Sequence, residues 1–339
     1  PTAIVLGGLL LDSVGWRPLF LTPLPLVLAA AAVTAMLARE LTPVRQSRRT
    51  FDAAGSLLIL VSMAAILFGV NQAVMLGWSS LPIVLSLSIG CFALAALVLV
   101  ERRASSPVID PQIATDKVFV AAIPMLLLQG MSYLAAFIVA PFLLLNKLGL
   151  DSVHASLVLV LRPAFFSSTN IAVGEMSDRV EPTKIMIVGF SCGALAYVVF
   201  AQMLALMQAS SGDFTQLLLL FAGPFSLQAV GAACVWTPMQ RFLTSRVPSE
   251  RLANFNGVTS LMSSLGMATG TALGNCVVSA AGGYDELGAY VTVMHVCAGL
   301  AAAGFSFSVY LWQLQRTGYP NPWKAPRDAV APGPAVPAQ

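Results

Sequence analysis

Charged residues are missing from long stretches of this sequence. Only 10% of its 339 residues are charged, against about a quarter in ordinary globular domains. An uncharged apolar run of about 20 residues is long enough to cross a bilayer as a helix. A soluble core could not hide this many such runs, so the pattern predicts a polytopic membrane protein. No Asp, Glu, Lys or Arg lies between Asp52 and Glu101, Lys117 and Lys147, Lys184 and Asp213, Asp213 and Arg241, Arg251 and Asp285, or Glu286 and Arg316.

Residues and motifs that carry chemistry are also scarce. There are two histidines, no HExxH or GxSxG motif, and no P-loop, so the sequence argues against an enzyme and against direct ATP use. The five cysteines form no CxxC pair and are expected to be small packing residues. We therefore predict no cofactor and no metal. The net charge of +3 is explained by topology and does not suggest nucleic acid as a partner.

The sequence is rich in long runs of apolar residues that can form helices. Hydrophobic residues make up 57%, and runs such as 57–70 show no alternation of the kind that a membrane β-barrel needs. The predicted fold class is therefore an all-α polytopic membrane protein. Because the chain begins with Pro inside a half-length apolar piece, Thr2 to Leu11, we expect it to be the C-terminal part of a longer protein. Nine complete spans are predicted, at 19–37, 54–75, 81–100, 119–142, 153–173, 184–207, 215–236, 256–280 and 289–313.

Basic residues predict the orientation, because cytoplasmic loops retain Lys and Arg. Of the 18 basic residues, 15 fall in alternate loops and the tail, whereas the opposite loops hold Arg17 and Lys147, and Arg162 lies within a span. This predicts a multi-pass protein of the cytoplasmic (inner) membrane with a cytoplasmic C-terminus. The 15 residues are Arg39, Arg45, Arg48, Arg49, Arg102, Arg103, Lys117, Arg179, Lys184, Arg241, Arg246, Arg251, Arg316, Lys324 and Arg327.

The N-terminal residues carry a first resemblance to a known family. Leu6-Gly7-Gly8-Leu9-Leu10, followed by Asp12, Gly15-Trp16-Arg17-Pro18-Leu19-Phe20 and Pro25, resembles the fifth helix and the turn into the sixth helix of a major facilitator branch, the 14-helix drug:proton antiporters. Ala3-Ile4 stands where that branch usually has Gly-Pro, so its antiporter signature is half present. Paired glycines let two helices approach closely, so Gly7 and Gly8 serve either packing or gating.

A second resemblance lies in a charged loop. Residues 174–184, Gly-Glu-Met-Ser-Asp-Arg-Val-Glu-Pro-Thr-Lys, are similar to the superfamily's G-x-x-x-D-R-x-G-x-K/R loop, with Glu175 and Glu181 as departures. The resemblance implies a cytoplasmic gate of Gly174, Asp178, Arg179 and Lys184. Asp178 could face the next helix N-terminus and pair with Arg179 or a neighbouring basic residue. The alternative is a solvated turn that only retains positive charge on the inside.

A third resemblance covers the later helices. Pro224-Phe225-Ser226-Leu227-Gln228 and the glycine series Gly266, Gly270 and Gly274 look like helices twelve and thirteen of the same branch. Small residues every four positions place a smooth stripe on one helix face, so we expect a tight helix crossing here.

Together the resemblances imply an incomplete major facilitator fold with about nine full helices and part of another. The implied domains are 1–50, the end of an N-terminal six-helix bundle; 51–103, two linking helices; 104–313, a C-terminal six-helix bundle; and 314–339, a disordered cytoplasmic tail rich in Pro and Ala.

Arg162 is the outlier within the spans, since an Arg at mid-bilayer costs on the order of 3 kcal/mol by insertion scales. It is either a cation of a central cavity or an internal brace, which could satisfy the carbonyl freed by Pro163. The other substrate-cavity candidates are Gln129, Gln228, Phe165 and Phe166, although hydrogen bonding between helices would also explain the two amides. The proton-coupling candidate is His295, which could equally be structural.

The resulting hypothesis is a secondary transporter, by resemblance a proton-coupled exporter of amphipathic drugs or toxic compounds. The alternatives are a transporter of a specific metabolite, anionic given Arg162, and a non-transporting membrane sensor or assembly protein. The expected partners are a small-molecule substrate, protons and the lipid bilayer, with a periplasmic membrane-fusion adaptor as a further partner implied by relatives.

Overall fold

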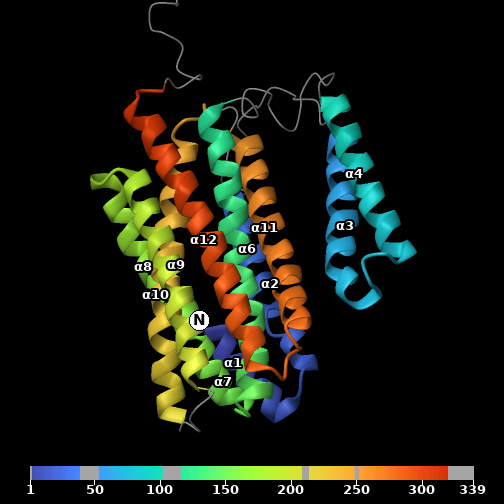
Figure 1. The fold of residues 1–339 in the computed structure, drawn as a ribbon. Coiled ribbons are helices and arrows are strands. Elements are labelled where there is room, and N and C mark those ends of the chain that lie inside the picture. Colours follow the sequence, from blue (N-terminus) through green and yellow to red (C-terminus); the bar gives the residue numbers. More distant parts are fainter. Residues whose placement is uncertain (1, 39–52, 102–115, 208–213, 249–251, 320–339) are drawn as a thin grey trace, which may run out of the picture.

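The structure, a computed structural model, describes residues 2–38, 53–101, 116–207, 214–248 and 252–319. Within these ranges every regular element is helical (Figure 1). The α-helices are α1 (Thr2–Val14), α2 (Leu24–Ala38), α3 (Ala53–Leu76), α4 (Leu81–Glu101), α6 (Lys117–Phe142), α7 (Ser152–Leu159), α8 (Leu161–Arg179), α9 (Pro182–Met207), α10 (Phe214–Thr244), α11 (Leu252–Ala280) and α12 (Leu287–Arg316). A 3₁₀ turn, η1 (Arg17–Phe20), precedes α2, and a π-helical segment, η2 (Leu143–Lys147), extends α6.

The predicted all-helical membrane architecture is confirmed. Eight helical segments in the described residues are long and apolar enough to cross a membrane. Eight of the nine predicted spans coincide with them. The ninth, 215–236, coincides with α10, which is not among the eight. Its polar positions are used for contacts with neighbouring helices, as described below.

One predicted span is interrupted in the structure. The range 153–173 was expected as a single helix, but α7 ends at Leu159 and α8 begins at Leu161, with Val160 between them. Pro163 has no backbone N–H, so the Leu159 carbonyl four residues earlier loses its helical donor. The interruption therefore lies directly before Arg162.

The helices from α6 to α12 form one bundle. Helix α6 packs against α11 and α12, α9 packs against α10 and α12, and α8 packs against α10 (Figure 1). Helix α1 contacts α7, and the pair α3 and α4 pack on each other, with α3 reaching α11.

The glycine series on α11 forms the tight crossing that the sequence predicts. A Cβ atom added at Gly266, Gly270 or Gly274 would lie 3.0, 2.7 or 3.3 Å from the Cα atom of Leu127, Met131 or Ala135 on α6, respectively. Such distances leave no room for a side chain, so the two backbones are in direct contact. Helices α9 and α10 cross in the same way, through the glycines at 189 and 231.

The paired glycines of α1 differ in their surroundings. A Cβ atom at Gly8 would collide with the Ser156 side chain and lie 2.9 Å from the Ser152 carbonyl oxygen, both on α7. At Gly7 the nearest atom is Leu19 Cδ2, at 3.9 Å. Only Gly8 is therefore needed for the close approach of α1 to α7.

The two ends of the bundle differ in charge. The N-terminal ends of α6, α9 and α11 lie at the same end as the C-terminal ends of α8, α10 and α12 (Figure 1). The described basic residues at this end are Lys117, Arg179, Lys184, Arg241, Arg246 and Arg316. The basic residues predicted in 39–52, 102–115, 249–251 and 320–339, and most of the predicted tail, lie outside the described residues.

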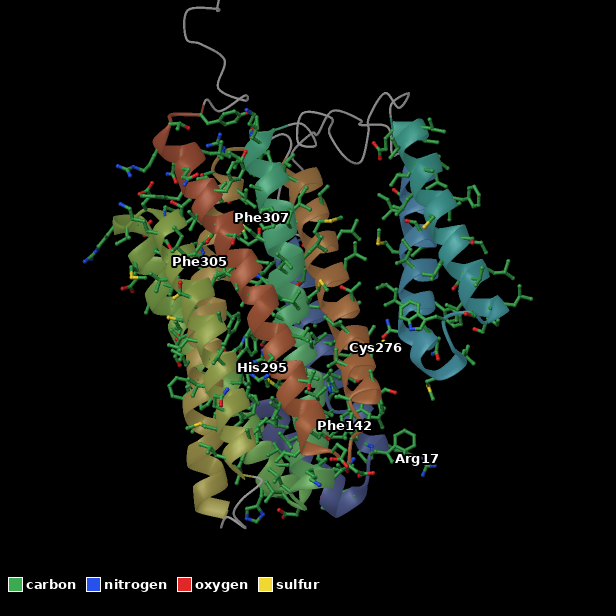
Figure 2. All side chains as sticks on the ribbon, viewed as in Figure 1. Arg17, Phe142, Cys276, His295, Phe305 and Phe307 are labelled. Carbon is green, nitrogen blue, oxygen red and sulfur yellow. The ribbon has the colours of Figure 1, made fainter. Side chains whose placement is uncertain are left out.

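The opposite end carries acidic groups beside Lys147. The Lys147 Nζ donates to the Asp285 carbonyl oxygen over 2.7 Å. Asp151 caps α7 by accepting from the His154 backbone N–H, and the adjacent His154 imidazole lowers the pKa of the Asp151 carboxyl. Arg17 lies at this end as well (Figure 2). The charge asymmetry expected from the sequence therefore separates the two ends of the described bundle.

Replacing Gly270 by Ala should destabilise the protein by about 1–3 kcal/mol, because the added methyl group forces α11 away from the α6 backbone. The matched control is Gly257→Ala on the same helix, where an added Cβ would meet no atom within 4 Å. The control should be neutral or slightly stabilising, since Ala favours helix more than Gly does. Thermal unfolding in detergent measures both, and equal effects of the two substitutions would contradict the tight crossing.

Candidate functional site

Arg162 is fully buried at the start of α8, with 1% of its surface exposed. Its Nε donates to Gln228 Oε1 on α10 over 2.6 Å, and its Nη2 donates to the Tyr133 carbonyl oxygen on α6 over 2.8 Å. The guanidinium therefore joins three helices. The Leu159 carbonyl oxygen, which lacks a helical donor because of Pro163, is not among these partners of Arg162.

Two aromatic rings on α6 enclose the same guanidinium. Arg162 Cζ lies 3.8 Å from the Tyr133 ring centroid and 5.0 Å from that of Phe137. The faces of aromatic rings attract cations, by roughly 2 kcal/mol or more when the pair is desolvated. Because Tyr133 and Phe137 are one helical turn apart, one face of α6 supplies both rings.

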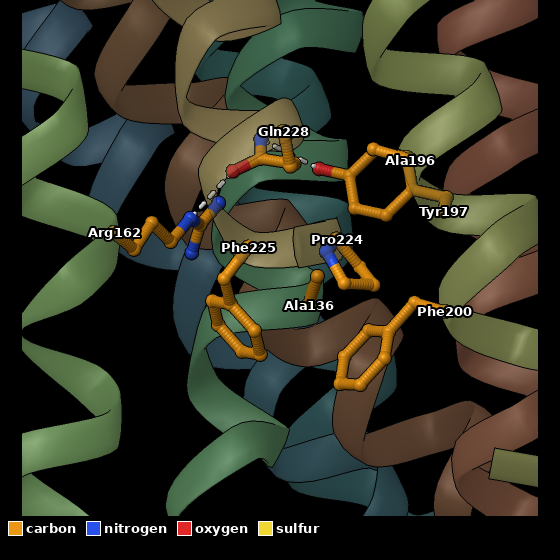
Figure 3. Close-up of a pocket in the computed structure, with 8 residues that line it drawn as sticks. All are labelled: Ala136, Arg162, Ala196, Tyr197, Phe200, Pro224, Phe225 and Gln228. Atoms are coloured by element: carbon orange, nitrogen blue, oxygen red, sulfur yellow. Dashed lines mark hydrogen bonds between the residues drawn. The ribbon is translucent and has the colours of Figure 1, made fainter. Parts of the chain in front are cut away.

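The hydrogen-bond chain continues to a fourth helix. Gln228 Nε2 donates to the Tyr197 hydroxyl oxygen on α9 over 3.1 Å (Figure 3). That hydroxyl donates to the Ser132 carbonyl oxygen on α6 over 2.8 Å. Arg162, Gln228 and Tyr197 thus connect α6, α8, α9 and α10 through buried polar groups. These contacts are the ones expected of an internal brace, one of the two roles that the sequence leaves open for Arg162.

These three side chains also line a small pocket, here called the Arg162 pocket. The space enclosed within it is about 10 Å³, room for about one water molecule and far below the range of about 300–1,000 Å³ usual for drug-sized ligands. In this conformation the pocket would have to widen to admit anything larger than a water molecule. The lining residues are Ala136, Arg162, Ala196, Tyr197, Phe200, Pro224, Phe225 and Gln228 (Figure 3).

Farther along α8, polar groups on one face contact α10; we call this contact the polar seam. Thr237 donates to the Asn170 amide oxygen. Arg241 donates to the Gly174 carbonyl oxygen over 3.2 Å and forms an ion pair with Asp178. The three α8 residues are four positions apart, so they share one face. Arg241 is the basic neighbour that the sequence left open as the partner of Asp178.

The other residues of the charged loop lie outside the polar seam. Lys184 pairs with Glu181 at 3.0 Å, and Arg179 is exposed at the end of α8. The Glu181 that departs from the usual Gly thus has a local basic partner three residues along the chain.

The remaining predicted cavity residues do not line the Arg162 pocket. Gln129 is buried on α6, Phe165 is 44% exposed on α8, and Phe166 is partly buried with its ring 6.1 Å from that of Tyr133. His295 lies in the first third of α12 with an exposed side chain (Figure 2). Of the five cavity candidates, Arg162 and Gln228 are the two that the structure places together in the Arg162 pocket.

Sequence reasoning missed Tyr133, Tyr197 and Arg241. A Tyr in the middle of an apolar span is a signal for Tyr197, because a buried hydroxyl needs a hydrogen-bond partner. Arg241 was counted only as a basic residue of a cytoplasmic loop. Its role depends on where α10 ends relative to α8, which sequence spacing does not provide.

The bundle matches a known protein family. The Major Facilitator Superfamily model covers residues 122–337. The chain belongs to the Major Facilitator Superfamily. The match includes all helices that supply the Arg162 pocket and the polar seam.

Named relatives in this superfamily are similar over about four-fifths of the chain. Multidrug resistance protein Stp of Mycobacterium tuberculosis is 25% identical, over 82% of this chain and 50% of its own length. Multidrug export protein EmrB of Escherichia coli is 23% identical, over 79% of this chain and 51% of its own length. Lincomycin resistance protein LmrB of Listeria monocytogenes is 22% identical, over 81% of this chain and 56% of its own length. The chain spans about half the length of these relatives.

Replacing Gln228 by Leu should destabilise this superfamily member by about 1–3 kcal/mol or more, because it leaves a buried charged donor without its hydrogen-bond acceptor. The matched control is Gln202→Leu, at an exposed position on α9, which should change stability little. In a Gln228→Leu background, Tyr197→Phe should cost less than in the wild type, because the two residues act in one network. Denaturant or thermal unfolding measures these differences, and strictly additive effects would refute the network.

Proposed function

We propose that this chain is part of a secondary active transporter that exports amphipathic drugs or toxic compounds across the cytoplasmic membrane, driven by protons. The observation that carries the proposal is its similarity to proteins named for multidrug export and resistance. A bundle of membrane-length helices supports transport, and the Arg162 pocket in its interior has apolar walls with a few polar side chains. Apolar walls with a few polar anchors suit amphipathic ligands.

The same proposal includes the domain arrangement and the orientation. The mutual packing of α6 to α12 supports residues 104–313 as one six-helix bundle, with α7 and α8 counted as one span. Helices α3 and α4 would be the linking pair of 51–103, and α1 and α2 would belong to 1–50. The basic end of the bundle would face the cytoplasm, because basic residues are retained there.

The polar seam is proposed as the cytoplasmic gate. The side chains of Asp178 and Arg241 are about half exposed, at 56% and 49%. Exposed ion pairs stabilise proteins by only about 0–1 kcal/mol. A pair of that strength can form and break in every transport cycle, as alternating access requires. Gly174 accepts from the same guanidinium, whereas Arg179 and Lys184 would keep positive charge at this end.

Gly8 is proposed to act where the two halves of the transporter meet. Its close contact with α7 would let α1 slide along that helix while the access side changes. Gly7, which has no comparable contact, would only keep this face of α1 narrow.

Proton coupling rests on the resemblance to antiporters. His295 stays a prediction as the coupling group, although an exposed position outside the pocket does not favour it. The periplasmic adaptor also stays a prediction from relatives alone.

A direct test uses proteoliposomes that contain the natural protein at its full length. With an imposed pH gradient, a fluorescent amphipathic cation should be transported, and transport should stop when the gradient is collapsed. Flux that persists without a gradient would overturn proton coupling, and an absence of flux for a panel of amphipathic compounds would overturn the exporter assignment.

Replacing Asp178 by Asn should lower the transport rate several-fold, because the gate loses its ion pair. Arg241→Gln should have the same effect, and the double variant should be no slower than either single variant, since all three remove one interaction. The matched control is Glu175→Gln, an exposed acid on the same helix, which should transport at the wild-type rate. A rate for Asp178→Asn equal to that of the control would contradict the gating role.

A further inference from the structure

We propose that the Arg162 pocket binds a small anionic group of the carboxylate type. The group would come either from the transported compound or from a free anion. The first source rests on the proposed transport function, whereas binding of a free anion does not.

The guanidinium has unused hydrogen-bonding capacity. Arg offers five N–H donors, and Arg162 uses two of them, toward Gln228 and the Tyr133 carbonyl oxygen. Its Nη1 atom is buried and has no hydrogen-bond partner among the described residues. Buried donors are nearly always paired in folded proteins, so this nitrogen marks a place for an acceptor from outside the chain.

The charge of Arg162 is also uncompensated within the described part of the chain. None of the ion pairs found there includes it, and the pocket lining contains no Asp or Glu. Its partners are an amide oxygen, a backbone carbonyl oxygen and two aromatic rings, all of which are neutral. An anion would supply the missing opposite charge in a setting where little water screens it.

The guanidinium selects a small group with two oxygens, and the pocket lining would move apart to admit it. The planar guanidinium fork matches a carboxylate better than it matches a spherical ion. Phe200, Pro224 and Phe225 form apolar walls beside it, which suit the first carbons attached to the carboxylate. A compound such as benzoate combines both features, so it is a suitable probe.

The test measures ligand-induced thermal stabilisation of the natural full-length protein in detergent. Benzoate, formate and benzamide are titrated separately, while the salt of a bulky sulfonate keeps the ionic strength constant. Benzoate should raise the melting temperature in a saturable manner, and benzamide, which has no charge, should not. A response to formate as well would identify a free anion as sufficient, whereas a response to benzoate alone would indicate the carboxylate of a larger compound.

Arg162→Gln should weaken benzoate binding about tenfold or more, the loss expected for one charge-assisted hydrogen bond. Arg316→Gln, at the exposed C-terminal end of α12, is the matched control and should bind as the wild type does. If the Arg162 variant does not fold, the wild-type titrations decide the question by themselves. No saturable effect of benzoate or formate, or an unchanged affinity in a folded Arg162→Gln protein, overturns the proposal.

The outcome is separate from that of the transport assay. Benzoate binding without flux of amphipathic compounds would overturn the proposed function and leave the anion site standing. Flux of a neutral or cationic compound without benzoate binding would support the proposed function and overturn the anion site.

Discussion

The bilayer offers no water to polar groups, and the other features of this structure follow from that constraint. Every backbone amide in the hydrocarbon must be paired within its own segment, so the described spans are helices. The helices gain little from hydrophobic association in lipid and must hold together by close packing or by buried polar contacts. This protein uses both solutions.

The close-packed solution joins α6 to α11 and α9 to α10. There, glycines bring two backbones into direct contact, and any added side-chain atom would separate them. The polar solution joins α8 to α10, through the bond between Arg162 and Gln228 at one level and the polar seam nearer the basic end. Hydrogen bonds and an exposed ion pair can be exchanged for others more easily than a packed glycine crossing can be remade. We therefore expect α8 to be the element that moves relative to the rest of the bundle.

Much of the fold could be predicted from the sequence, because the constraint of the bilayer acts on local composition. Charge-free runs gave the spans, and small residues at Gly266, Gly270 and Gly274 gave the tight crossing before its partner helix was known. The interruption at Val160 was readable in principle from Pro163, whose missing donor affects a carbonyl at a fixed distance along the chain.

The site was less predictable, because its contacts depend on how separate helices are rotated. Arg162 was recognisable as costly, but its partner Gln228 lies 66 positions away on α10. The partner of Asp178 was open for the same reason, since Arg241 is 63 positions away. His295 and Phe165 show the converse limit: residue type alone suggested a role in the interior, and their side chains are exposed.

The central claim is that these helices cross the membrane with their basic ends on the cytoplasmic side, so that the polar seam faces inward. In a variant without native cysteines, single cysteines replace Glu175 at the end of α8 or Asn146 in η2. A membrane-impermeant maleimide added to intact cells should label the cysteine at position 146 and should label the one at 175 only after the cells are opened. Labelling of both positions from the same side would contradict the account, and the proposed gate would then have no basis.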